Sequence, residues 1–270
     1  MKRREFIMTA GLAAMAGAGC KSVPMGTQAT EAGGAQQLLQ LRTFSFANEE
    51  KLKIFAEFTE KSMIPAMNRA GVTPVGAFRV LKADNPKTEA DELIIRVLLP
   101  FPDAASMLTL SKRLMADATF AEAQQAVLGT PMKDPVYLRF ETQLMLAFTQ
   151  CPKVEVPTTA ADRVLQLRIY ESHNCERAAR KMQMFNEGGE IALFRRLGMN
   201  PVFFGSSIAG TKLPNLHYML GFESPAAQEA GWKKFRTDPE WAKLSKDPQY
   251  KDTVSNITNL ILRPLPGSQI

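Results

Sequence analysis

Two segments of the chain place an arginine between a glutamine and an aromatic residue, with one residue separating each from the next. They are Gln40, Arg42 and Phe44 in the first segment and Gln166, Arg168 and Tyr170 in the second. Alternate residues of a strand project from the same face, so each set is expected to lie together. A guanidinium beside an amide and an aromatic ring could bind an anion or a carboxylate. The same arginines could instead belong to a salt-bridge network that seals the interior, with Glu141 as a counter-ion.

The two histidines of the chain, His173 and His217, are the candidates for acid–base chemistry. His217 and Tyr218 are neighbours in an apolar segment typical of a strand, so one should face the barrel and the other the helices. A buried His217 could act as a general base or a haem ligand, or it could be a hydrogen-bonded strand residue without a reactive role. His173 precedes a predicted helix whose N-cap is Ser172 or Asn174, and we expect it to be exposed.

The chain lacks the motifs that usually carry catalysis or cofactor binding. It contains no GxSxG, no HExxH, no Walker loop, no GxGxxG after a strand and no acidic metal cluster. The sequence therefore predicts no catalytic residue, no metal and no cofactor, with haem as the alternative if His217 serves as a ligand. Whether the protein is an enzyme stays open at this point.

The first 20 residues resemble a bacterial export signal. A basic start, Lys2–Arg4, precedes an apolar run, Phe6–Ala18, that is too short to span a bilayer. Paired arginines followed by x-Phe-Ile are typical of the twin-arginine route. Cys20 follows small residues that resemble a lipobox, so either lipidation of Cys20 or an ordinary cut nearby would end the signal. We therefore expect a signal over residues 1–20, a flexible tether over 21–36, and a periplasmic or cell-envelope location in which a lipid anchor is the only route to a membrane.

Charge and cysteine usage narrow the set of partners. The formal net charge of +6 falls to +4 without residues 1–20, because the basic start and Glu5 together contribute +2. No dense basic stripe with interleaved aromatic residues is present, so nucleic acid is not an expected partner. Cys151 and Cys175 could pair in an oxidising compartment or could be two separate small apolar residues, and their spacing suggests neither a metal nor a redox site.

An internal repeat explains why the Gln-Arg-aromatic pattern occurs twice. Three segments return in the same order at a nearly constant spacing. They are LLQLRTF and VLQLRIY (residues 38–44 and 164–170), RAGVTPV and RLGMNPV (69–75 and 196–202), and DATFA and DPEWA (117–121 and 238–242). We therefore predict a first module over residues 37–150, a linker over 151–161 and a second module over 162–266.

Hydrophobic periodicity predicts the element order βαββαβ in each module. The predicted strands and helices are 38–46, 48–70, 75–81, 92–99, 103–128 and 136–148 in the first module, and 164–170, 174–197, 202–208, 216–223, 225–246 and 254–263 in the second. Gly71 and Gly198 are placed to end the first helix of each module, a position that favours glycine. Such a module forms a four-stranded antiparallel sheet with its helices on one face, which leaves the other face to be covered.

The first strand of each module predicts how the two sheets meet. Leu39 and Leu41, with their counterparts Leu165 and Leu167, are expected to lie under the helices of their own module. The Gln-Arg-aromatic face would then meet the sheet of the other module and close an α+β barrel within one chain. The expected binding site is therefore a cavity between the two sheets.

The repeated motifs resemble those of the NIPSNAP family. The resemblance rests on the strand pattern L-Q-L-R-x-Y/F, on the turn R-x-G-x-x-P-V, and on D-P-E-W at residues 238–241; it covers about 162–266 and, in a diverged copy, about 36–150. It implies the dimeric α+β barrel, in which ferredoxin-like modules pair sheet to sheet. The resemblance brings no catalytic residues, and other families with this fold include cofactor-independent monooxygenases, haem-dependent enzymes and binding or stress proteins.

The favoured function is that of an exported protein that binds a small ligand or a protein partner in the inter-sheet cavity. The two Gln-Arg-aromatic sets, together with His217 and Tyr218, would line that cavity. The alternatives are a monooxygenase-like or haem-using enzyme with His217 or Tyr218 near its substrate, and a protein that mediates association at the cell envelope. The identity of the ligand and any further oligomerisation are not determined by the residues.

Overall fold

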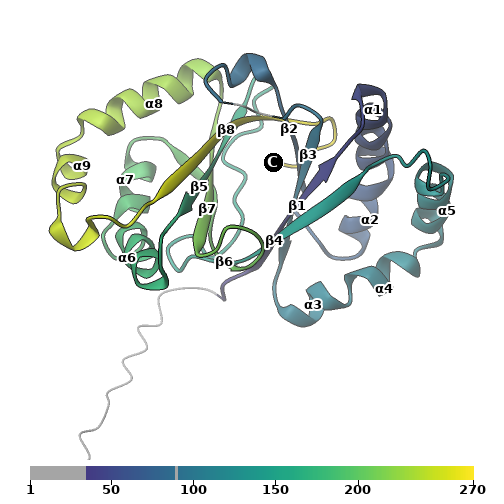
Figure 1. Cartoon of the computed structure of the whole chain (residues 1–270), viewed down its shortest axis with the longest axis horizontal. Helices are drawn as coiled ribbons and strands as arrows, with labels where there is room; N and C mark the ends of the chain where they lie inside the picture. Colours follow the sequence, from purple (N-terminus) through teal and green to yellow (C-terminus); the bar gives the residue numbers. More distant parts are fainter. Residues whose placement is uncertain (1–34, 89–90) are drawn as a thin grey trace, which may run out of the picture. The chain divides into compact units, whose positions relative to one another are not determined.

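The order of strands and helices is the one that the sequence predicts, βαββαβ in each module (Figure 1). The computed structural model describes residues 35–88 and 91–270; the predicted export signal, Cys20 and residues 21–34 of the predicted tether lie outside them. The first module contains β1 (Leu38–Ser45), α1 (Glu49–Phe58), the π-helical turn η1 (Thr59–Met63), α2 (Ile64–Arg69), β2 (Gly76–Val80), η2 (Lys82–Asp84), β3 (Ile94–Phe101), α3 (Ala104–Leu108), α4 (Leu110–Met115), α5 (Ala118–Leu128) and β4 (Arg139–Ala147). The second contains β5 (Val164–Glu171), α6 (Cys175–Phe185), α7 (Glu190–Arg196), β6 (Asn200–Ala209), β7 (Asn215–Phe222), α8 (Pro225–Thr237), α9 (Pro239–Leu244), η3 (Pro248–Tyr250) and β8 (Asn256–Pro264).

The first helical segment of each module begins and ends on equivalent residues. The side chains of Asn48 and Asn174 accept hydrogen bonds from backbone N–H groups of the first turns of α1 and α6. Gly71 and Gly198 follow α2 and α7 with φ of +79° and +73°, a left-handed conformation that favours glycine. The predicted helix stops are therefore confirmed.

One ion pair also recurs at equivalent positions. Arg69 Nη2 lies 2.6 Å from Asp117 Oδ2 in the first module, and Arg196 Nη2 lies 2.9 Å from Asp238 Oδ1 in the second. Each aspartate also caps a helix, α5 or α9, through a backbone N–H. The sequence repeat is thus a repeat of tertiary contacts.

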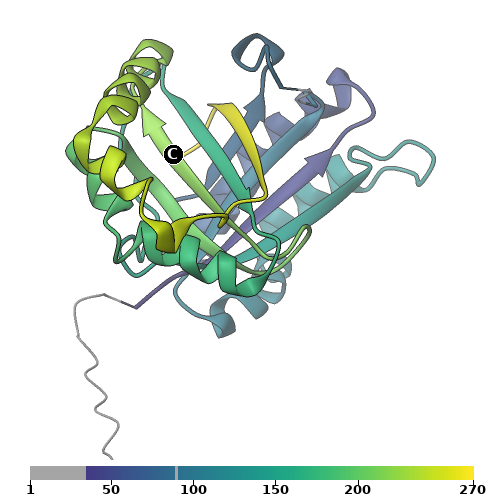
Figure 2. The ribbon, with the colours of Figure 1, turned by 60° about the vertical axis from the view of Figure 1, so that its left-hand side comes forward.

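The two sheets join edge to edge into one closed barrel with the strand order β1-β3-β2-β8-β5-β7-β6-β4. Within it each module has the ferredoxin-like order, β4-β1-β3-β2 or β8-β5-β7-β6, and the modules meet through the antiparallel pairs β2–β8 and β4–β6. The helices of the two modules lie on opposite outer sides of the strands (Figures 1 and 2). The fold is therefore two tandem ferredoxin-like modules that form an α+β barrel within one chain.

The face assignment made from the sequence is wrong. Leu39, Leu41, Leu165 and Leu167 belong to the apolar cluster that fills the barrel interior, rather than to the cores under the helices. The Gln-Arg-aromatic faces of β1 and β5 lie on the outer side of the barrel, beneath the helices of their own modules. The physical reason is the space available on each face of the sheet. A barrel of this size has an interior filled by close-packed apolar side chains. Long polar side chains fit between the sheet and the helices, where their polar ends can reach water.

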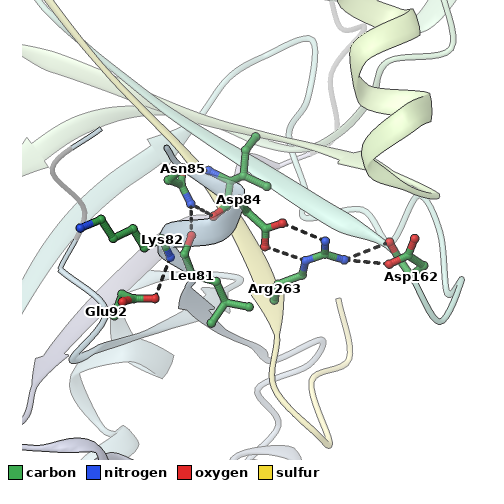
Figure 3. Close-up of polar contacts among 8 residues, drawn as sticks. Leu81, Lys82, Asp84, Asn85, Glu92, Asp162 and Arg263 are labelled. Atoms are coloured by element: carbon green, nitrogen blue, oxygen red, sulfur yellow. Dashed lines mark hydrogen bonds and ion pairs between the residues drawn. The ribbon is translucent and has the colours of Figure 1, made fainter. Parts of the chain in front are cut away.

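Polar contacts reinforce the short junction between β2 and β8 (Figure 3). The ladder pairs only residues 78–80 with 262–264. Beyond it, the Asn85 amide accepts a hydrogen bond from Ile261 N at 2.8 Å and donates one to Ile261 O at 2.9 Å, as a neighbouring strand would. Arg263 binds both oxygens of Asp84, at 2.8 and 2.9 Å, and also Asp162 at 2.9 Å. These contacts tie the loop after β2 to the last strand of the second module.

Candidate functional site

The residues predicted to share one cavity lie in three separate places. Each Gln-Arg-aromatic set lines a cavity between the sheet and the helices of its own module, and His217 lines a third cavity at one end of the barrel. We call these the Arg168 cavity, the Arg42 cavity and the barrel-end cavity. Tyr218 is fully buried and belongs to the core under the second module's helices. As predicted, His217 and Tyr218 face opposite sides of β7.

The Arg168 cavity, of about 600 Å³, lies between β5 and β8 on one side and α6 to α9 on the other. The guanidinium carbon of Arg168 lies 4.7 Å from the ring centroid of Trp232 and 5.2 Å from that of Tyr170. Arg168 Nε is buried without a hydrogen-bond partner, and no carboxylate of the described residues forms an ion pair with Arg168. The aromatic rings provide cation–π contacts but no oxygen acceptor, so the N–H groups of the guanidinium are left for an oxygen ligand.

Gln166 fixes one wall of the Arg168 cavity. Its side chain is 3% exposed. Its Nε2 donates to Asn259 Oδ1 at 2.6 Å, and its Oε1 accepts from Gln228 Nε2 at 2.9 Å and from Trp232 Nε1. Gln166 therefore positions the tryptophan on which Arg168 stacks, and it has no amide hydrogen-bonding group directed to Arg168.

A buried ion pair spans the break between α6 and α7 and lines the same cavity. Lys181 Nζ lies 2.8 Å from Glu190 Oε2, with side chains 6% and 2% exposed. Gly189, with φ of +85°, begins α7 in the left-handed region, so residues 188–189 break the predicted single helix in two. Lys181 and Glu190 neutralise each other, and the exposed Glu229 and Arg236 of the lining carry opposite charges, so the net charge of the lining is that of Arg168.

The tyrosines of the second module act as hydrogen-bonding and packing groups. Tyr170 Oη lies 3.2 Å from Tyr218 Oη, and the Tyr218 ring stacks on Phe204 at 4.9 Å between centroids. Burial raises the pKa of Tyr170 and of Tyr218, so both phenols stay protonated at neutral pH. Tyr170 can therefore donate a proton in a hydrogen bond to a ligand, but it is a poor base.

The Arg42 cavity, of about 620 Å³, occupies the equivalent place in the first module and has fewer charged lining residues. Arg42 is the one charged side chain among its described lining residues, and its Nε donates to Gln40 Oε1 at 3.1 Å. Phe44 and four methionines line it, and the exposed side chains of Leu108 and Phe140 lie among its lining residues. Burial lowers the pKa of Arg42, since a desolvated cation is less stable.

Glu141 is not the counter-ion of Arg42. In the register of β1 and β4, Glu141 lies opposite Thr43, whereas Arg42 lies opposite Thr142. Glu141 therefore projects to the barrel side and lines the barrel-end cavity. The salt-bridge network that was the alternative to an anion pocket is absent among the described residues around Arg42 and Arg168.

His217 projects from the inner face of β7, so the sheet separates it from the two cavities beneath the helices. It is 5% exposed, and burial together with the charge of Arg96 lowers its pKa to about 3. The imidazole is therefore neutral at physiological pH. The cavity that it lines has about 290 Å³, and no histidine of the described residues lines either larger cavity. These residues do not fit haem with His217 as its ligand.

The remaining chemical candidates carry no site in the described part of the chain. Cys151 is buried and Cys175 is exposed, and both are free. Burial and the nearby Glu155 raise the pKa of Cys151 to about 12, so its thiol is unreactive at neutral pH. Residues 35–88 and 91–270 contain no cluster of three or more metal-ligating side chains. Nor does any helix among them have the length and apolar character needed to cross a membrane.

Sequence patterns did not predict that Lys181, Glu190 and Trp232 line this cavity. Lys181 had a readable signal, because it falls on the buried stripe of α6 with Ala178 and Phe185. A charged residue on such a stripe requires a buried partner. Nothing in the local sequence indicates that Gln166 would orient Trp232.

The protein is, by its architecture, a single-chain α+β barrel of two tandem modules. Residues 165–269 match the model of the family described as NIPSNAP. The match covers the second module, which is therefore similar to NIPSNAP domains. No curated protein matches this sequence.

Solved structures share the fold across both modules. A candidate monooxygenase from Fusobacterium nucleatum subsp. nucleatum ATCC 25586 has 10% sequence identity and a TM-score of 0.58, covering 86% of this chain and 93% of its own. Another from Lactobacillus acidophilus NCFM has 10% identity and a TM-score of 0.53, covering 85% and 94%. An uncharacterized NIPSNAP-like domain protein from Burkholderia xenovorans has 22% identity, covering 38% of this chain and 85% of its own, with a TM-score of 0.34. At 10% identity the likeness to the two monooxygenase structures is one of fold.

Proposed function

We propose that this protein binds a small molecule with an apolar body and one acidic group, in the cavities beneath the helices. The observation that carries the proposal is the recurrence of one arrangement in both modules. Arg42 and Arg168, at equivalent positions of β1 and β5, each line a cavity of about 600 Å³ with aromatic walls. Neither has a carboxylate partner among the described residues. A cation held in this way is costly to desolvate, and an acidic ligand would offset that cost.

The two cavities differ in the ligand body that they favour. In the Arg168 cavity, Trp232 and Tyr170 flank the guanidinium, which favours a flat aromatic acid whose carboxylate lies in the guanidinium plane. The Arg42 cavity is lined by flexible methionines such as Met63 and Met67, which adapt to apolar bodies of varied shape. Both therefore select an acid group, and the Arg168 cavity selects more strongly for planarity.

The location of this activity follows from the N-terminal residues. The export pattern over residues 1–20 supports a periplasmic or cell-envelope protein, with lipidation at Cys20 as the route to membrane attachment. A small-molecule binding protein in that compartment needs no motif for nucleotide or metal. The enzyme alternative rests on fold alone, because Tyr170 stays protonated and His217 is on the other side of the sheet.

Isothermal titration with 1-naphthoate tests the proposal, with 1-naphthalenemethanol as the neutral ligand of the same shape. Hydrogen bonds to a charged group contribute about 1.5–3 kcal/mol, so Arg168→Gln should weaken the naphthoate complex of its cavity by about 10- to 150-fold. Binding should also quench the fluorescence of Trp232. Arg180→Gln, at an exposed position on α6, is the matched control and should leave the affinity unchanged.

The same titration identifies the cavity that is used. Loss of the complex in Arg168→Gln assigns binding to the second module, and loss in Arg42→Gln assigns it to the first. Equal affinity for naphthoate and for the neutral alcohol, or full naphthoate binding in the Arg42→Gln/Arg168→Gln double variant, would overturn the proposal.

A further inference from the structure

The barrel-end cavity is polar, whereas the rest of the barrel interior is apolar. On β5 the interior runs from Leu165 and Leu167, within the apolar cluster, to Ile169 and Glu171, which line the cavity. At the opposite end, Arg163 donates a hydrogen bond to the backbone oxygen of Ile270, which packs into the barrel. The cavity has about 290 Å³, enough for a molecule of a few heavy atoms beyond water. It lies on the inner face of the sheets, so it is independent of the function proposed above.

Arg96 is one of four charged residues that line this cavity, with Glu141, Glu171 and Lys212. It lies opposite Thr43 in the register of β1 and β3, and both side chains line the cavity. Its Nη1 is buried without a hydrogen-bond partner, and Arg96 forms no ion pair within the described residues. Burial lowers the pKa of Arg96 to about 10, so the guanidinium stays charged at neutral pH. A partly buried guanidinium whose Nη1 has no partner favours binding of an anion.

The hydrogen-bond directions around His217 are determined by its neighbours. Asn215 Nδ2 donates to the backbone oxygens of Thr211 and Lys212, both at 2.8 Å, so its Oδ1 is the atom near Ser207. Ser207 Oγ donates to this Oδ1 at 2.5 Å, which uses its one proton. Ser207 Oγ can then only accept from His217 Nδ1, at 3.3 Å. His217 Nε2 therefore carries a lone pair, and it accepts no hydrogen bond from any described residue.

Gln143 completes the rigid part of the cavity wall. Its Nε2 donates to Ser207 Oγ at 2.6 Å, and its Oε1 accepts from the backbone N–H of Thr211 at 3.2 Å. Gly210, with φ of +143°, lies so close that a Cβ there would be 1.9 Å from Gln143 Oε1. The loop that follows β6 is thus packed against this amide, and the lone pair of His217 has a defined position.

The two cations and two carboxylates of the lining sum to zero, which limits the negative charge that a ligand can carry. Lys212 lies 3.7 Å from Glu171 and offsets it. Glu141, which is exposed, adds a negative charge to the lining. Arg96 is influenced by the charge of the exposed Asp91 but forms no ion pair with any described residue. A second negative charge on the ligand would meet Glu141 without a further cation.

We infer that the barrel-end cavity binds a small hydroxylated monocarboxylate, whose carboxylate pairs with the Arg96 guanidinium and whose hydroxyl donates to His217 Nε2. The guanidinium offers parallel N–H donors that match a carboxylate. The imidazole lone pair is an acceptor, so it distinguishes an acid with a hydroxyl group from one without. Arg96 is the binding residue, and Ser207 and Asn215 are positioning residues that hold the tautomer of His217.

Calorimetric titration of the whole protein with glycolate, acetate and malonate tests this inference. Glycolate should bind at least tenfold more tightly than acetate, which lacks the hydroxyl, and malonate should bind more weakly than glycolate because of its second charge. Equal affinities for glycolate and acetate in the wild-type protein would overturn the inference without the need for any variant.

Two variants extend the test. Arg96→Met should abolish glycolate binding while raising the midpoint of thermal unfolding, because it removes an unpaired buried charge. Arg168→Gln, in the Arg168 cavity, should retain full glycolate affinity. A failure of the glycolate site can therefore be distinguished from a failure of the naphthoate site. Glycolate binding that survives Arg96→Met, or that is lost in a folded Arg168→Gln variant, would contradict the assignment.

Discussion

His217 should make the protein lose stability on mild acidification. The imidazole is 5% exposed, and burial with the charge of Arg96 lowers its pKa to about 3, against 6.5 for an unperturbed histidine. Between these values the unfolded chain binds more protons than the folded protein. The contribution of His217 to stability is therefore complete above pH 6.5, falls as the pH is lowered, and is fully lost below pH 3.

The size of this effect follows from the two pKa values. The loss between pH 7 and pH 5 is about 2 kcal/mol, and the complete loss below pH 3 is about 5 kcal/mol. Carboxylates also titrate on acidification, and Arg96, Glu141 and Glu171 line the same cavity. The useful quantity is therefore the difference between the wild type and His217→Gln, whose amide can still donate to Ser207 but does not titrate.

Urea denaturation followed by far-UV circular dichroism at pH 7, 6 and 5 measures this difference. The unfolding free energy of the wild type should fall by about 2 kcal/mol more than that of His217→Gln between pH 7 and pH 5. Parallel curves would refute the reasoning, because they would mean that His217 takes up its proton in the folded protein. The barrel end would then be open to water or would pair the imidazolium with an acid.

Three further expectations concern the second module and the repeat, each measured by urea denaturation. Glu190→Gln should cost about 3–5 kcal/mol because it leaves Lys181 buried and unpaired, whereas Lys181→Met combined with Glu190→Leu should be nearly neutral; a small effect of the single change would mean that the pair is hydrated. Gly189→Ala should cost about 1–2 kcal/mol because it forces a side chain into the left-handed region, and no change would show that α6 and α7 join differently. Asp117→Ala and Asp238→Ala should each cost about 1 kcal/mol through a lost helix cap, and a large inequality would argue against equivalent contacts in the two modules.

Repeated segments allowed the fold to be predicted because they fall at positions where local chemistry is specific. Gly71 and Gly198 occupy left-handed positions that few other residues adopt. Asp117 and Asp238 are helix caps that also bind Arg69 and Arg196. Such residues act through their nearest neighbours, so the order of elements follows from the sequence.

The orientation of the first strands could not be obtained in the same way. Both faces of β1 and β5 are covered, one by the barrel interior and one by helices, so alternation separates two sets without saying which is inside. Leu41 and Arg42 are adjacent, and exchanging their faces leaves the local pattern unchanged. The outcome depends on the space available on each side, which only the packed barrel defines.

Local sequence patterns also could not predict which residues meet within the cavities. Trp232 comes from α8, Lys181 from α6 and Gln166 from β5, and they meet only because the helices of the second module cover one sheet. His217 and Arg96 come from different modules and meet only when the barrel closes. The chemical types were visible in the sequence, whereas the groupings required the tertiary structure.

A crystal structure with 6-bromo-2-naphthoate would test most directly whether the acid-binding cavities lie beneath the helices. The anomalous signal of bromine should appear between the sheet and the helices, with the carboxylate in contact with Arg168 or Arg42 and the naphthalene ring against the aromatic walls. A bromine peak inside the barrel, between the two sheets, would contradict this account.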